Sequence, residues 1–143
     1  MLERTLLTKM LAVIGLVCLL SLTSITSAQQ EPRMEHNAFL RKPVLSAEGL
    51  TEQVGSDPVV LKRYEKHFMM DKKGLKDYMA KLRLKPLGET KRFYVYNVDK
   101  KFVIRKRLLT VRRGTMVFVD PNGKPVLKRS CGNPLISYLP PKG

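Results

Sequence analysis

The chain has 143 residues, of which 27 are lysine or arginine and 12 are aspartate or glutamate, so its formal net charge is +15. This length allows one domain with a tail and excludes a large multidomain enzyme. Nine glycines and nine prolines are too few for a fibrous or low-complexity protein, and 43% apolar residues suffice for a core.

The first 28 residues have the features of a secretory signal peptide. Arg4 and Lys9 form a basic start, an apolar run covers residues 10–20, and small side chains precede a cleavage site after Ala28. The alternative is a retained signal anchor, but a membrane span needs about 20 apolar residues and this run becomes rich in serine and threonine. We therefore expect export to the periplasm or beyond, with no retained transmembrane helix.

The excess positive charge belongs to the second part of the chain. Residues 29–57 carry five acidic and three basic side chains, a net −2, whereas residues 58–143 carry 22 basic and six acidic ones, a net +16. Residues 29–56 show no sustained period, which predicts a flexible arm or linker with at most a short helical turn near 45–50. The folded domain is predicted over residues 57–139, followed by a tail at 140–143.

Two short helices are predicted at the start of the domain. Asp57 followed by Pro58 is a helix-start signal, and Asp71 is the expected cap of a second helix. Pro86 and Gly88 are expected to end this second helix. Each helix has one apolar face, formed by Val60, Tyr64 and Phe68 in the first and by Leu75, Tyr78, Met79 and Leu82 in the second.

The remainder of the domain is predicted to be β-structure. Residues 93–98 are aromatic and β-branched, which is typical of a strand buried on both faces. After a turn at Asp99–Lys100, residues 101–113 continue as a strand whose apolar residues change parity, and this predicts a bulge between Arg105 and Leu108.

A hairpin completes the predicted fold. Residues 115–119 and 125–129 flank the turn sequence Asp-Pro-Asn-Gly at 120–123. The expected fold class is therefore α+β, with two short helices packed on a small antiparallel sheet of three to five strands.

Several blocks of the chain carry a resemblance to a known family. They are Asp77–Arg83, Leu108-Leu109, Gly114-Thr115-Met116-Val117-Phe118-Val119-Asp120, Gly123–Val126 and Cys131-Gly132-Asn133-Pro134-Leu135. The stretch from Leu75, about half the chain, resembles the C-terminal region of secreted or surface bacterial proteins, best known from actinomycetes and assigned only a domain of unknown function. Such relatives often have a second cysteine where this chain has Arg129. The resemblance implies an extracytoplasmic domain and brings no known activity or ligand.

Cys131 is the one cysteine that remains after removal of the signal peptide. An odd thiol in an exported protein is either buried and inert or paired with another molecule. A catalytic thiol would need a base, and the two histidines lie in the predicted arm (His36) and on a helix as an expected half-exposed residue (His67). Gly132 and Asn133 suit a turn with positive φ, and Pro134 ends a strand, so this block is expected to reverse the chain.

No motif in the sequence indicates an enzyme, a cofactor or a metal. It has no glycine-rich phosphate loop, no metal-type spacing of cysteine and histidine, and no Gly-x-Ser-x-Gly motif. The six carboxylates of residues 58–143 are scattered over expected helix surfaces and turns. We therefore expect a non-enzymatic protein without a cofactor.

Basic side chains crowd the β region, with Tyr94 and Tyr96 between them as a stacking surface of the kind used for nucleic acids. The alternative is that both tyrosines are core and the cations only keep strand edges soluble. Outside the cytoplasm, phosphate polymers, acidic glycans, anionic lipids and extracellular DNA would all attract such a domain.

We accordingly expect a domain that binds an anionic envelope or extracellular polymer. The first alternative is a protein-assembly module that uses the arm or Cys131, and the second is a small thiol enzyme. The expected binding residues are Lys101, Arg105, Arg107, Arg112, Arg113, Lys128 and Arg129. The expected motif and turn residues are Gly114, Asp120, Gly123, Cys131, Gly132, Asn133 and Pro134.

Overall fold

A computed structural model of the chain describes residues 33–137. The predicted signal peptide, the first residues of the predicted arm and residues 138–143 lie outside this range. The α+β prediction is confirmed, with three helices among the described residues where two were expected. The elements are α2 (Ala47–Ser56), α3 (Pro58–Phe68), α4 (Lys72–Met79), β1 (Arg83–Pro86), β2 (Lys91–Val98), β3 (Ile104–Val111), β4 (Met116–Val119) and β5 (Pro125–Lys128).

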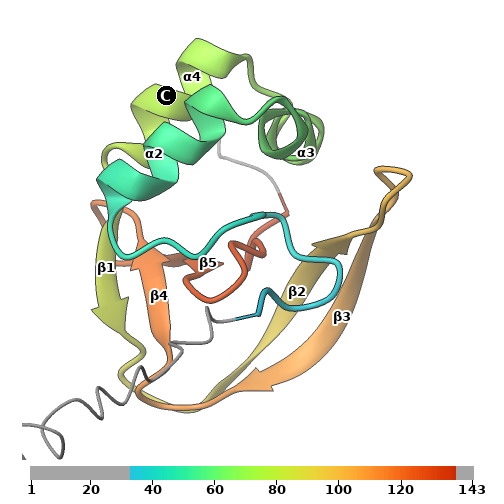
Figure 1. The fold of residues 1–143 in the computed structure, drawn as a ribbon. Helices are drawn as coiled ribbons and strands as arrows, with labels where there is room; N and C mark the ends of the chain where they lie inside the picture. The colour runs from blue at the N-terminus through green and yellow to red at the C-terminus, as the bar shows by residue number, and fades with distance from the viewer. Residues whose placement is uncertain (1–32, 138–143) are drawn as a thin grey trace, which may run out of the picture. The chain divides into compact units, whose positions relative to one another are not determined.

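The five strands form two antiparallel sheets. One sheet has the order β1-β4-β5, and the other consists of β2 and β3, which we call the ribbon. The three helices lie together over the three-stranded sheet, whereas the ribbon is a long, curved hairpin beside it (Figure 1).

The core has two parts, on opposite faces of β4. Phe118 belongs to the larger cluster, which the helices cover, and its neighbours Val117 and Val119 belong to a smaller cluster beneath the ribbon. This division follows from the strand period of two, since successive side chains point to opposite faces. The three-stranded sheet therefore separates the helices from part of the ribbon.

Both predicted helix starts are confirmed. The carboxylate of Asp57 accepts a hydrogen bond from the Val59 amide at 3.0 Å, and that of Asp71 accepts one from the Gly74 amide at 2.8 Å. The predicted end of the second helix is wrong, because α4 ends at Met79 and residues 83–86 form β1. Leu82 matched the helical spacing, yet it is buried just after the helix.

The predicted flexible arm is contradicted for its described residues. Phe39, Leu40 and Val44 are buried in the larger cluster, and α2 adds Leu50 and Val54 to the same cluster. A run of three adjacent buried residues (38–40) and a pair of buried apolar residues one helical turn apart in α2 are too short to give a periodic pattern. The absence of a period therefore did not mean the absence of a core contribution.

Two predictions about the ribbon are also wrong. Its register runs without a shift from Lys91–Val111 to Val98–Ile104, so there is no bulge between Arg105 and Leu108. The parity change arises because Ile104 packs on the larger cluster and Val111 on the smaller one, on opposite faces of the strand. A two-stranded ribbon twists strongly enough to serve both. The second wrong prediction is that β2 is buried on both faces, because its residue Tyr94 is 51% exposed.

The predicted hairpin at residues 115–129 is confirmed. The carboxylate of Asp120 accepts hydrogen bonds from the amides of Asn122 and Lys124, both at 2.9 Å. Gly123 has the positive φ of +80° that such a turn requires. The pairing of β4 with β5 shifts its register once, between Phe118 and Val119.

Candidate functional site

The ribbon concentrates positive charge. Residues 91–113, which comprise the ribbon, its turn and the two residues after it, include nine basic side chains and one acidic one, Asp99. All nine basic residues are exposed. Apart from the pair between Arg105 and Asp99, they form no ion pair within residues 33–137. Eight cations therefore remain available to an external anion.

Asp99 organises the turn at the tip of the ribbon. Its carboxylate accepts hydrogen bonds from the Lys101 and Val103 amides at 2.8 and 3.0 Å, and from Arg105 Nη1 at 2.9 Å. The hydrogen bond from Val103, followed by those from Arg105 and Lys101, lowers the pKa of Asp99. The single carboxylate of the ribbon is thus occupied by the turn itself.

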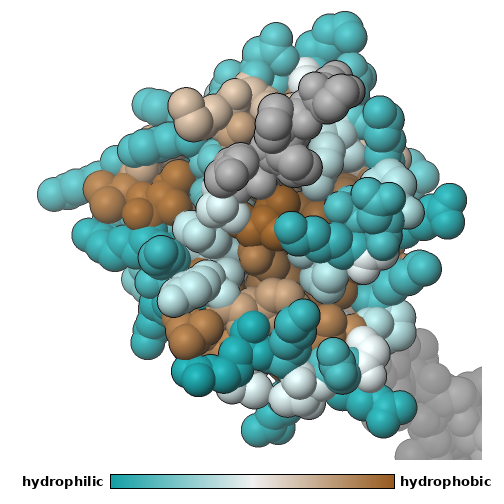
Figure 2. Space-filling view, turned by 180° about the vertical axis from the view of Figure 1, so that it is seen from behind, coloured by the Kyte–Doolittle hydropathy of each residue, from teal (hydrophilic) through white to brown (hydrophobic). Residues whose placement is uncertain are grey.

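Apolar side chains lie between the cations on both faces of the ribbon. Tyr94 pairs with Leu108, which is 43% exposed, and the Nζ of Lys106 lies 4.8 Å from the Tyr94 ring centroid. The opposite face exposes Leu109 beside Arg107. In the view from behind the molecule, Figure 2 shows exposed hydrophobic patches that hydrophilic residues closely border. The surface therefore offers ring or chain contacts as well as charge.

Five of the seven predicted binding residues lie on this surface. Arg105 and Arg107 share one face of β3, Lys101 lies at the tip, and Arg112 and Arg113 follow the other end of the strand. Eight residues of strand put these two ends about 25 Å apart. Such a surface fits a long ligand rather than a single small anion.

The other two predicted residues do not belong to the ribbon. Lys128 is in β5, and its Nζ lies 3.6 Å from a carboxylate oxygen of Glu35. Arg129 follows it and is partly buried, with its amide donating to the Met116 carbonyl at 3.1 Å. Lys128 thus pairs with the segment before α2, and the Arg129 backbone pairs with β4, away from the ribbon.

Sequence reasoning missed Lys91 and Arg92 as members of the surface. They stand opposite Val111 and Thr110 in the ribbon. The turn at Asp99 carries this information, because counting backwards from a hairpin turn gives the register of both strands. Of the two tyrosines, Tyr94 is exposed, as a stacking surface requires. Tyr96 instead packs on the core, with its ring centroid 4.6 Å from that of His67.

The Cys131–Leu135 block has a structural role beyond the predicted reversal. We call residues 131–136 the connector. The Lys128 amide donates to the Asn133 carbonyl and the Leu135 amide to the Val126 carbonyl, whereas the Tyr96 amide donates to the Pro134 carbonyl. The connector therefore lies between β5 and β2 and joins the two sheets.

Buried polar groups hold the connector to the helices and to the N-terminal segment. The Asn133 Oδ1 accepts a hydrogen bond from the Phe39 amide at 2.9 Å, and the Tyr64 hydroxyl donates to the Gly132 carbonyl at 2.7 Å. Gly132 has the predicted positive φ, +68°. The Cys131 thiol is free and fully buried, and burial raises its pKa.

His67 is buried, contrary to the expected half-exposed position. Its Nε2 lies 2.7 Å from the Ile136 carbonyl, and burial lowers its pKa from 6.5. The unfolded chain therefore binds more protons than the folded one below about pH 6.5. We expect the free energy of unfolding to decrease as the pH falls through this range.

Urea unfolding at pH 7.5, 6.5 and 5.5 measures this effect. His67→Gln should reduce the pH dependence, whereas His36→Gln, at an exposed position, should retain it. Equal pH dependence in the two variants would assign the effect to other groups.

Two further features bear on function. Within residues 33–137, no helix is long and apolar enough to cross a membrane, and no three side chains of His, Cys, Asp or Glu are grouped as metal ligands. Comparisons with protein-family models, curated proteins and solved structures gave no match to the chain. The predictions about function accordingly rest on the chain's own residues.

Proposed function

We propose that this protein is an exported, non-enzymatic domain whose ribbon binds an anionic polymer of the cell envelope or the extracellular space. The observation that carries the proposal is the set of eight exposed cations in residues 91–113 that form no ion pair within residues 33–137 and have exposed apolar side chains between them. A polyanion would replace its counterions by these cations, and the released ions would favour binding. Export rests on the signal-like sequence of residues 1–28.

The length of the ribbon favours a polymer over a single phosphate or carboxylate. Cations occur at the start of β2, within β3 and at both ends of the ribbon, over about 25 Å, so successive charges of one chain can each find a partner. Tyr94 and Leu108 add an uncharged contact in the middle of this path. Phosphate polymers, acidic glycans and DNA share this chemistry.

The two alternatives, a protein-assembly module that uses the arm or Cys131 and a small thiol enzyme, both need groups that are accessible to another molecule. Phe39 and Leu40, in the segment expected to be an arm, are buried in the core, and so is the Cys131 thiol. A buried thiol with a raised pKa has little of the thiolate form that nucleophilic catalysis or disulfide exchange requires. We therefore retain polymer binding as the proposal.

The binding prediction compares two double variants of equal charge. Lys106→Gln with Arg107→Gln removes two cations of the ribbon, and Lys72→Gln with Arg83→Gln removes two exposed cations from α4 and β1. With a labelled heparin oligosaccharide, the ribbon variant should lose about tenfold in affinity at low salt, and the slope of log K against log salt should fall by about 1 to 2. Fluorescence anisotropy over a sodium chloride series measures both.

The control separates a ribbon site from the effect of net charge alone. The variant in α4 and β1 should keep most of the affinity and the original slope. Equal losses in the two variants would remove the ribbon from the proposal. Affinity that is unchanged between low and high salt would refute polymer binding itself.

A further inference from the structure

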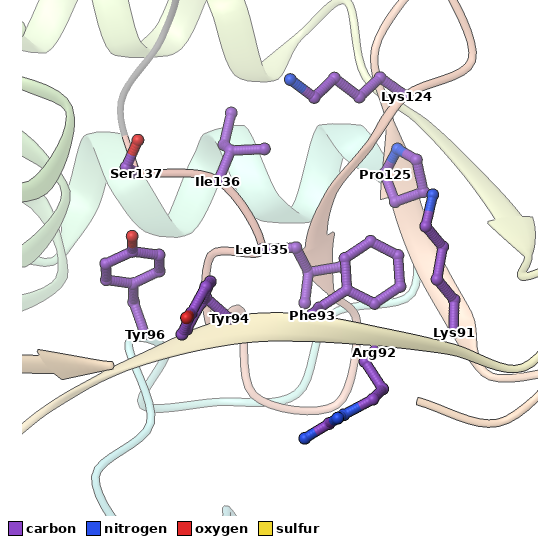
Figure 3. A pocket seen from close by; sticks show the side chains of 10 residues that line it. All are labelled: Lys91, Arg92, Phe93, Tyr94, Tyr96, Lys124, Pro125, Leu135, Ile136 and Ser137. Atoms are coloured by element: carbon purple, nitrogen blue, oxygen red, sulfur yellow. The ribbon is translucent and has the colours of Figure 1, made fainter. Parts of the chain in front are cut away.

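A hollow of about 530 Å³ lies between β2 and the beginning of β5 (Figure 3). Residues Lys91–Tyr94 of β2 line one side, Lys124 and Pro125 line another, and Leu135 of the connector also contributes. The Arg92 side chain points away from the side of β2 on which Lys91 projects (Figure 3). We call this hollow the slot.

The slot is the continuation of the gap between β5 and β2, and the connector fills the other part of this gap. The connector is hydrogen-bonded on one side to Val126 of β5, at 2.7 Å, and on the other to Tyr96 of β2, at 2.9 Å. After Leu135 it leaves the sheets, and the Ile136 carbonyl meets His67 of α3. Strand β2 extends five residues beyond Tyr96, to Lys91. Beyond Leu135, the slot therefore lies beside the edge of β2 and the beginning of β5, the same two strands that border the connector.

The edge of β2 along the slot has hydrogen-bonding groups that no residue in the range 33–137 satisfies. The amides of Tyr96 and Val98 point away from β3 and donate to the carbonyls of Pro134 and Asn37. Because strand amides alternate in direction, those of Tyr94 and Arg92 point the same way. Neither has a hydrogen-bond partner in the described part of the chain. An added strand would satisfy them.

The opposite side of the slot offers charge rather than backbone groups. Pro125 has no amide hydrogen, and the Val126 carbonyl already accepts from Leu135. The side chains of Lys91 and Lys124 border the slot, and none of the described residues that line it is acidic. A ligand that hydrogen-bonds to β2 would thus place its neighbouring side chains near two ammonium groups.

We propose that the slot binds an extended acidic peptide of a protein partner, which adds as a strand to the open edge of β2. A polypeptide presents amide hydrogens and carbonyls at the spacing of a strand edge, which a glycan or a nucleic acid does not. Lys91 and Lys124 favour carboxylate side chains on this peptide. This proposal goes beyond polymer binding by the ribbon and does not depend on it.

The test titrates the ¹⁵N-labelled protein with an acetylated, amidated hexapeptide of alternating glutamate and valine. Two further peptides carry N-methyl groups on either the odd-numbered or the even-numbered amides. In an added strand only one of these sets faces β2, so we expect one methylated peptide to bind about fivefold more weakly and the other to bind as the parent does. The amides of Arg92 and Tyr94 should become protected from hydrogen exchange in the complex.

Two protein variants locate the charge contribution. Lys124→Gln should weaken the parent peptide several-fold, whereas Lys72→Gln, on the exposed side of α4, should leave its affinity unchanged. The proposal is overturned if the parent peptide does not bind at millimolar concentration, or if both methylated peptides bind as it does. It is also overturned if heparin, but not the peptide, protects the Arg92 and Tyr94 amides. Loss of heparin binding in the ribbon variant would leave the peptide result intact.

Discussion

Gly132→Ala is expected to destabilise the protein by about 4 kcal/mol or more, enough to unfold a large fraction of a small domain. A methyl group at this position would collide with the Tyr64 hydroxyl and would lie 2.5 Å from Leu40 Cγ. Neither neighbour can move easily, since Tyr64 is fully buried and hydrogen-bonded to the Gly132 carbonyl. The φ of +68° adds about 1 to 2 kcal/mol of backbone strain. Urea unfolding followed by circular dichroism measures the loss.

Gly123→Ala is the matched control. Its φ of +80° imposes a similar backbone strain, but, its two chain neighbours apart, no atom of the described residues lies within 4 Å of the added methyl group. We expect a loss of about 1 to 2 kcal/mol, from the backbone alone. Similar losses at positions 123 and 132 would mean that the contact between the connector, Tyr64 and Leu40 is not tight.

Phe39→Ala is expected to cost about 3 to 5 kcal/mol, the usual range for removing a fully buried phenylalanine side chain. The Phe39 ring packs on Tyr64 and His67, with centroid distances of 5.1 and 5.6 Å. This substitution tests whether the segment before α2 is part of the core. The free energy of unfolding from urea titration is again the measurement.

Leu45→Ala provides the comparison within the same segment. Leu45 is 76% exposed, so its truncation should change stability by no more than about 0.5 kcal/mol. An arm that only visits the core would show small effects at both positions. A large effect at Phe39 with a small one at Leu45 requires a fixed segment.

Local signals in the sequence predicted those elements that local residues determine. Asp57 and Asp71 identified the starts of α3 and α4 because a capping carboxylate binds amides two or three residues ahead. The turn at Asp120 likewise depends on residues within four positions. These interactions need no knowledge of the remaining chain.

The errors occurred where distant partners decide the structure. Residues 38–40 have no period of their own, and their burial depends on hydrogen bonds to Cys131 and Asn133. The exposure of Tyr94 depends on the position of β2 in a two-stranded ribbon. A sequence pattern cannot distinguish an apolar residue that covers a core from one left on a ribbon face.

The candidate site was predictable in composition but not in shape. The excess of cations in residues 91–113 is evident from the sequence, and so is the turn at Asp99 that separates its two strands. The separation of Lys128, in β5, and of Arg129, just after β5, from the ribbon could be seen only from the sheet topology. The open edge of β2 could not have been expected, because it depends on where the connector leaves the sheets.

The position of the connector has a consequence for how the chain folds. It joins β5 to β2, and Asn133 also binds Phe39, 94 residues earlier in the chain. The contacts that unite helices, three-stranded sheet and ribbon thus form between the first and last described segments, and such long-range closure is entropically slow. Helices and hairpins can form while the chain is still being synthesised. The domain itself becomes cooperative only after Asn133 has emerged. The export that we propose would therefore meet little resistance from premature folding.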